Sequence, residues 1–131
     1  MFSHIFIGVT DFERALAFYR VLMPVLEIKE RFCDAERPWA GWQSEPGPRP
    51  LFVIAEPFDK QNHQAGNGQM VALLATDREM VRRAHEVALA NGATCEGPPG
   101  VRHEYHDHYF GAYFRDTEGN KICVVCHTPL N

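Results

Sequence analysis

Hydrophobic and polar positions along the chain form two similar series. Residues 3–9 (SHIFIGV) make an apolar, alternating run that ends at Thr10-Asp11, where a helical pattern begins. Residues 69–75 (QMVALLA) make a second apolar run, which ends at Thr76-Asp77 before another helical pattern. Alternation with period two is typical of a strand, and apolar residues three and four apart are typical of an amphipathic helix. Each series therefore predicts a strand followed by a helix.

The two series align through their Thr-Asp pairs, which indicates an internal repeat. The alignment pairs apolar positions of the first strand with apolar positions of the second, and it places His4 on Met70. Because both faces of residues 3–9 are largely apolar, we expect this strand to be buried on both sides. The repeat thus places a histidine and a thioether at equivalent positions of two buried strands.

The remaining elements follow in the same order in each half. The first helix begins at the N-cap Asp11 and ends at Pro24, and strands are expected at about 25–33, 39–43 and 50–56. The second helix ends near Asn91-Gly92, and strands are expected at 93–95, 108–115 and 121–126. The run 97–100 (GPPG) is expected to be a loop between strands.

These elements predict an α+β fold of two βαβββ modules within one domain, residues 1–131. The first module covers about residues 1–57, the linker about 58–68 and the second module about 69–127. Each curved sheet would carry its helix on the outer face. We expect the inner faces to form a half-open barrel with a small-molecule pocket between the modules.

Composition and charge limit the classes of molecule that the protein is expected to bind. The chain has 45% hydrophobic residues, a net charge of −4 and no Lys/Arg cluster, so nucleic acid is not an expected partner. No apolar run approaches the ~18 residues of a membrane span, so we expect no membrane partner. No signal peptide is visible, which predicts a cytoplasmic protein. Its four cysteines are then expected to be free thiols.

The sequence resembles the vicinal oxygen chelate superfamily, which includes glyoxalases, bleomycin-resistance proteins and extradiol dioxygenases. The resemblance covers nearly the whole chain. It rests most strongly on residues 4–9 (HIFIGV) with 11–15 (DFERA) and Phe18-Tyr19, and on 114–122 (FRDTEGNKI). Further pieces are 57–59 (PFD), 66–68 (GNG), Tyr105-His106 and 109–112 (YFGA). It implies the half-barrel fold, a small-molecule ligand or substrate and a homodimer. The scaffold hosts unrelated reactions, so the resemblance does not fix an activity.

The resemblance also implies a metal site, which this chain alters. Members of the superfamily usually hold one divalent metal with His, Glu or Gln from the first and fourth strands of each module. The matching positions here are His4 and Met70 on the first strands, a residue near Leu51, and Cys123 on the last strand. Only His4 and Cys123 suit a transition metal, and two protein ligands are fewer than the three or four expected. The expected cofactor is therefore none, or one divalent transition metal. Without a metal, His4 is expected to be a partly buried, hydrogen-bonded histidine.

Two further motifs carry candidate chemistry. In residues 103–108 (HEYHDH), His106 and His108 would share one face of a strand and chelate a transition metal, or they are solvated at a rim. His106, Tyr109 and Tyr113 are also expected to line a ligand cavity. Residues 123–127 (CVVCH) match the c-type haem attachment pattern, but residues three apart on a strand face opposite ways, so buried cysteines are favoured.

Three functions compete at this point. The first is a glyoxalase- or dioxygenase-like enzyme, a lyase or dioxygenase, with His4, His106 and Tyr109 as catalytic residues and a degenerate metal site. The second is a metal-free protein that binds or sequesters a small molecule, like the bleomycin-binding branch. The third is a non-catalytic dimer with a vestigial site. The expected pocket residues are Met70, Trp42, Phe52 and Tyr113.

Overall fold

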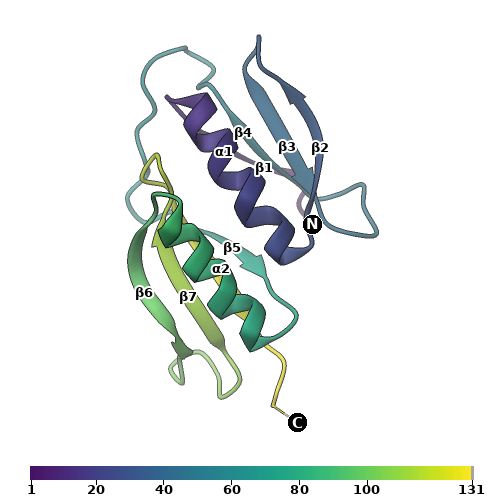
Figure 1. Ribbon diagram of the computed structural model, residues 1–131, viewed down its shortest axis with the longest axis vertical. Helices are drawn as coiled ribbons and strands as arrows, with labels where there is room; N and C mark the ends of the chain where they lie inside the picture. Colours follow the sequence, from purple (N-terminus) through teal and green to yellow (C-terminus); the bar gives the residue numbers. More distant parts are fainter. Residues whose placement is uncertain (131) are drawn as a thin grey trace. The chain divides into compact units, whose positions relative to one another are not determined.

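The computed structural model describes residues 1–130, and these divide into two compact units. The first unit is Met1–Ala65, and the second begins at Gly66. The boundary between the units falls inside the segment 58–68, which the sequence predicts to be a linker. Each unit contains one four-stranded mixed sheet with one α-helix on one of its faces (Figure 1).

The first unit has the order strand, helix, three strands. Its sheet has the strand order β1-β4-β3-β2, with β1 parallel to β4 and the other pairs antiparallel. A 3-10 helix, η1, follows the α-helix directly. The bounds are β1 His4–Gly8, α1 Phe12–Leu22, η1 Met23–Leu26, β2 Lys29–Asp34, β3 Trp39–Gln43 and β4 Leu51–Ala55.

The second unit repeats this topology. Its strand order is β5-β8-β7-β6, again with the first strand parallel to the last and the other pairs antiparallel. The bounds are β5 Val71–Leu74, α2 Arg78–Ala90, β6 Thr94–Val101, β7 Phe110–Arg115 and β8 Lys121–Cys126. The predicted α+β class and the two βαβββ series are confirmed.

Both helices begin at the aspartates that the sequence indicates. Asp11 accepts a hydrogen bond from the backbone N–H of Arg14, and Asp77 accepts one from the N–H of Met80. These side chains satisfy amide groups that the first turn of a helix leaves without partners. The repeated Thr-Asp pair therefore marks the same junction in each unit.

Two strand predictions were wrong at their ends. The strand expected from residue 25 begins only at Lys29, because η1 occupies residues 23–26 and Glu27 then adopts a left-handed backbone conformation with φ of 58°. The run 97–100, expected to be a loop, lies within β6, and the pairing of β6 with β7 shifts register twice across it. Prolines lack an N–H, but β6 is an edge strand with irregular pairing, where this is tolerated.

Aromatic side chains fill the core of the first unit. Tyr19 of α1 packs on Trp42 of β3 and Phe52 of β4, with ring centroids 5.9 Å and 5.1 Å away. All three residues are buried. The face of the sheet that carries Trp42 and Phe52 is therefore the face that α1 covers.

Strand β1 is not buried on both sides as expected. Ile5 and Ile7 are partly buried on the side of the sheet that carries Phe52 and Ile54, their partners on β4. His4 is exposed, and Phe6 is 50% exposed, because the first unit places no layer over this other face. The apolar alternation identified the strand correctly but overstated its burial.

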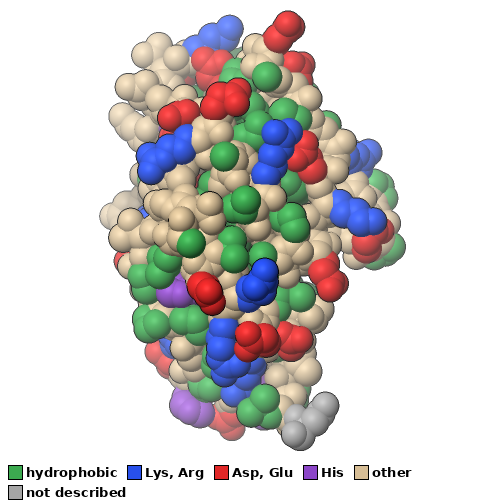
Figure 2. Space-filling view, viewed as in Figure 1, with side chains coloured by type: hydrophobic (Ala, Val, Ile, Leu, Met, Phe, Trp, Pro, Cys, Tyr) green, Lys and Arg blue, Asp and Glu red, His purple; other side chains and the backbone are tan. Residues whose placement is uncertain are grey.

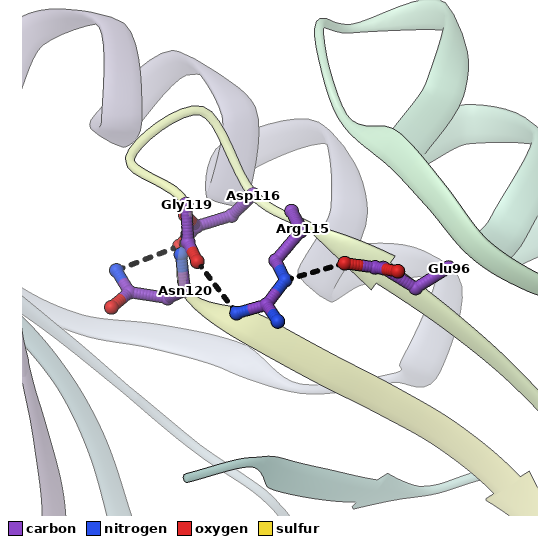
Figure 3. A network of polar contacts seen from close by, with 5 residues as sticks. All are labelled: Glu96, Arg115, Asp116, Gly119 and Asn120. Carbon is purple, nitrogen blue, oxygen red and sulfur yellow. Dashed lines mark hydrogen bonds and ion pairs between the residues drawn. The ribbon is translucent and has the colours of Figure 1, made fainter. Parts of the chain in front are cut away.

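The turn between β7 and β8 is organised by Asp116, which is buried (Figure 3). Its carboxylate accepts hydrogen bonds from the backbone N–H of Glu118 and from both the backbone and side-chain N–H of Asn120, at 2.8 to 3.2 Å. Arg115 donates to the carbonyl of Gly119 and to the carboxylate of Glu96. These contacts fix the register of β8 against β7.

The surface carries mixed charge. On the side of the molecule drawn in Figure 2, acidic and basic side chains are interspersed. Among residues 1–130, no helix is both long enough and apolar enough to cross a membrane.

Replacing Asp116 with Ala tests the role of this turn. The variant leaves amide donors without a charged acceptor, and we expect it to lower the free energy of unfolding by about 2 kcal/mol or more. Urea titration of the purified chain measures this. Asp59→Ala is the matched control, because Asp59 is exposed and accepts one hydrogen bond, from Gln61. Equal losses in the two variants would contradict the assignment.

Candidate functional site on the second sheet

The pleat of β7 and β8 sorts their side chains onto two faces. Phe110, opposite Cys126, lies under Arg78 and Arg82 of α2, with ring-to-guanidinium distances of 5.0 and 4.9 Å. Tyr113, opposite Cys123, therefore belongs to the other face, because strand side chains alternate. We call this face, away from α2, the open face of the second sheet.

Three polar groups are linked on the open face. The hydroxyl of Tyr109 lies 2.8 Å from the hydroxyl of Tyr113 and 3.5 Å from the thiol of Cys123. Cys123 is buried, and both tyrosines are partly buried. Either group can be the donor in each contact. In the arrangement in which the thiol donates to Tyr109 and Tyr109 donates to Tyr113, the proton of Tyr113 is available for an acceptor outside the chain.

Burial keeps all three groups protonated. It raises the pKa of Tyr109 and Tyr113 above their usual value near 10. Burial also raises the pKa of the Cys123 thiol. At neutral pH the open face thus presents neutral hydrogen-bond donors and acceptors rather than a thiolate or phenolate.

A glycine makes the contact of the two tyrosines possible. A Cβ atom at Gly111 would lie 2.9 Å from the Cε1 atom of Tyr109. The missing side chain lets the ring of Tyr109 lie across β7 and reach Tyr113, four residues along. Gly111 therefore positions the Tyr109 hydroxyl.

Two cations lie close to the ring of Tyr113. The guanidinium carbon of Arg102 lies 5.4 Å from the ring centre, and the ammonium nitrogen of Lys121 lies 5.7 Å from it. Cβ atoms at Gly97 and Gly100 would approach the guanidinium of Arg102 to 3.2 Å and 3.0 Å. The glycines of β6 therefore leave the space that Arg102 occupies, and both cations lie where they attract electron-rich groups.

A pair of histidines borders the tyrosines. His106 Nε2 and His127 Nδ1 are 2.8 Å apart, and the His106 ring meets the ring of Tyr109 edge-on. The backbone N–H of His108 donates to Nδ1 of His106, so Nε2 of His106 carries the proton that it donates to His127. The His106 ring is thus fixed by two hydrogen bonds.

The expected pairing of His106 with His108 on one strand face was wrong. Residues 103–108 lie in turns before β7, and His106 contacts His127 instead. Among residues 1–130, no group of three or more His, Cys, Asp or Glu side chains could hold a metal ion.

The donors at the superfamily's metal positions do not fit a divalent metal. In the first unit His4 is exposed and contacts the hydroxyl of its neighbour Ser3 at 2.9 Å, so it is hydrogen-bonded but not partly buried. In the second unit Met70 is 45% exposed, and a thioether is a poor ligand for a hard ion. Cys123 contacts the hydroxyl of Tyr109 and, among residues 1–130, belongs to no group of three or more possible metal ligands.

The strand register also corrects the fourth position. Cys123 lies opposite Ala72, two residues after Met70. In the first unit the residue opposite Phe6, two residues after His4, is Val53 rather than Leu51. Val53 adds an alkyl group and no donor, so the four matching positions carry His, Val, Met and Cys.

Two expected pocket residues have a packing role in the structure. Trp42 and Phe52 are buried against Tyr19 of α1, and this packing accounts for both without a ligand. By contrast, the structure brings Tyr109, Tyr113 and Cys123 together, and His106 adjoins them. His4 and Met70 belong to different units.

Arg102 and Lys121 lie in this site but were not among the site residues predicted from the sequence. Period-two alternation on β8 would have placed Lys121 beside Cys123 on the open face, so that signal was available. No comparable signal existed for Arg102, since it precedes an irregular turn and reaches Tyr113 across the glycines of an edge strand.

Family membership follows from comparison with known proteins. The sequence model of the glyoxalase/bleomycin resistance protein/dioxygenase superfamily matches residues 1–124. The chain belongs to this superfamily, as the resemblance indicated. No curated protein matches the chain.

Solved structures share the fold over nearly the whole chain. A glyoxalase/bleomycin resistance protein from Albidiferax ferrireducens T118 is 34% identical, with a TM-score of 0.82, covering 98% of this chain and 99% of that one. A family enzyme from Burkholderia phytofirmans PsJN is 18% identical, with a TM-score of 0.72 over 96% and 98%. A lactoylglutathione lyase from Agrobacterium tumefaciens is 16% identical, with a TM-score of 0.67 over 96% and 92%. The last two show the fold alone.

Gly111→Ala tests how the tyrosine pair is positioned. The new methyl group would displace the Tyr109 ring, and we expect the Tyr109–Tyr113 hydrogen bond to be lost while the chain stays folded. The chain has four tyrosines, so 13C NMR of Cζ-labelled protein resolves each one. The signals of Tyr109 and Tyr113 should shift, and the signal of buried Tyr19 should not. Unchanged signals for Tyr109 and Tyr113 would refute this role of Gly111.

Proposed function

We propose that this protein binds a small organic molecule on the open face of the second sheet without a metal. The observation that carries the proposal is the linked group of Tyr109, Tyr113 and Cys123. Its neutral hydroxyl groups can donate a hydrogen bond to an oxygen atom of a ligand. The tyrosine rings can pack against an aromatic or unsaturated part of the same ligand. The protein would act as a binding or sequestering member of the superfamily.

The character of the donors at the superfamily's metal positions supports a metal-free site. A metal bound by His4 would need further ligands of imidazole or carboxylate type, and the matching side chains Val53, Met70 and Cys123 include neither. Chemistry that uses a redox metal, as in a dioxygenase, is correspondingly disfavoured by this donor set.

A second candidate is metal-independent proton transfer of the lyase type. It is favoured by the His106–His127 pair, whose rings both contact the ring of Tyr109. His106 and Tyr109 would be the catalytic residues, since imidazoles exchange protons near neutral pH. His4, exposed on β1, would contribute at most a ligand contact. The two candidate functions are distinguished by an activity measurement, because only the second predicts that the bound molecule is converted to a product.

We also propose that the protein acts as a homodimer in the cytoplasm. The dimer is supported by exposed apolar side chains on faces that their own units leave uncovered, Phe6 in the first unit and Leu74 in the second. The compartment is supported by four free cysteines, of which Cys33 and Cys95 are exposed.

Binding of benzamide by protein treated with EDTA tests the proposed function. Its carbonyl oxygen is a neutral acceptor and its ring suits the tyrosine surface. We expect saturable shifts of the Tyr109 and Tyr113 signals in 13C NMR. Tyr113→Phe removes the donated proton and should weaken binding by about tenfold, the effect of one lost hydrogen bond.

Tyr105→Phe is the matched control for this experiment. Tyr105 is exposed and its ring packs on Tyr109, but its hydroxyl takes no part in the linked group. This variant should bind benzamide as the parent chain does. Absence of any saturable shift, or binding that appears only after a divalent metal is added, would overturn the proposal.

A further inference from the structure

The two cations beside Tyr113 are not neutralised by an acidic side chain. Among residues 1–130, neither Arg102 nor Lys121 forms an ion pair. Arg102 donates to the backbone carbonyl of Pro98 at 2.7 Å, which orients the guanidinium but brings no negative charge. Both cations are partly buried, and both favour the charged form of the Cys123 thiol.

The carboxylate of Glu96, on which Lys121 acts electrostatically, already has an ion-pair partner. Glu96 accepts a hydrogen bond from Arg115 at 2.7 Å, and this contact is the main reason that its pKa is lowered (Figure 3). Lys121 acts on Glu96 only as a weaker, more distant charge. Of the cations Arg102, Arg115 and Lys121, only Arg115 thus has an acidic partner in an ion pair among residues 1–130. Arg102 and Lys121 leave positive charge beside the ring of Tyr113.

An anion bound here would lower the electrostatic energy of both cations. Both side chains are partly buried, so solvent screens their charges less than it screens those of fully exposed groups. Arg102 also offers N–H groups in a planar fork, which suits the two oxygens of a carboxylate.

We infer that the ligand of the open face is an anion, and specifically a small organic carboxylate. Its carboxylate would lie beside Arg102 and Lys121, and an oxygen of it would accept the proton of Tyr113. The inference rests on the proposed function, because it uses the same face and the same tyrosine. It adds the chemical class of the ligand and two specificity-determining residues, Arg102 and Lys121.

Comparison of benzoate with benzamide tests the inference. The two molecules have nearly the same shape and differ in charge, so the ratio of their dissociation constants isolates the contribution of the cations. We expect benzoate to bind at least about tenfold more tightly in low salt, as for a hydrogen bond to a charged group. The preference should fall as salt is added.

Lys121→Met and Arg102→Gln should each weaken benzoate binding more than benzamide binding, so that the ratio of the two dissociation constants falls. Lys60→Met is the matched control, since it removes the same charge from an exposed lysine of the first unit. It should leave the preference unchanged. Circular dichroism of each variant shows whether the fold is retained, and Arg102→Gln provides the test if Lys121→Met does not fold.

The outcomes separate the inference from the proposed function. If benzamide binds through Tyr113 but benzoate binds no more tightly, the inference fails and the proposed function stands. A preference that survives in both variants, or that Lys60→Met removes equally, would show that general charge is responsible and would also overturn the inference. If neither molecule binds, both proposals fail.

Discussion

The alternation of side chains along β8 is the constraint on which the site depends. Ile122, Val124 and Cys126 face α2 and form the core of the second unit, while Lys121 and Cys123 face the other way. Core packing against α2 fixes the first set, so the second set is fixed with it. The buried turn at Asp116 holds this register. The chemistry of the open face is therefore positioned by the hydrophobic core on the reverse side of the same strand.

The proposed site would use neutral hydrogen-bond donors in place of metal ligands. Cys123 occupies a position where members of the superfamily usually have a metal ligand, and burial raises the pKa of its thiol. The thiol joins the two tyrosine hydroxyls, which Gly111 allows to meet. In the proposed site a hydrogen-bonded group thus takes the place of a metal ligand, and the same scaffold supports a different chemistry.

Much of the fold was accessible from the sequence. The repeated Thr-Asp pairs located both helices, and period-two alternation located β1, β3 and β8 within about a residue. The failures have physical causes. Strand β2 begins later than predicted because Glu27 has a left-handed backbone conformation. Strand β6 contains two prolines because it is an edge strand whose pairing with β7 is irregular.

The site was harder to predict from the sequence than the fold was, because it depends on contacts between side chains that sequence patterns do not specify. Tyr109, Tyr113 and Cys123 were all identified as candidates, yet their linkage depends on a missing side chain at Gly111. Trp42 and Phe52 show the reverse case. Aromatic side chains are equally compatible with a ligand pocket and with a core. The contacts of Trp42 and Phe52 with Tyr19 place both residues in the core.

The central claim is that the protein works without the divalent metal of its superfamily. Metal content of the purified protein, with thermal unfolding after addition of Zn²⁺, Mn²⁺ or Ni²⁺, tests it most directly. A metal-free site predicts less than one metal ion per chain and the same response to each ion in the parent chain and in His4→Ala. One tightly bound metal per chain that is lost in His4→Ala or Cys123→Ala would contradict it.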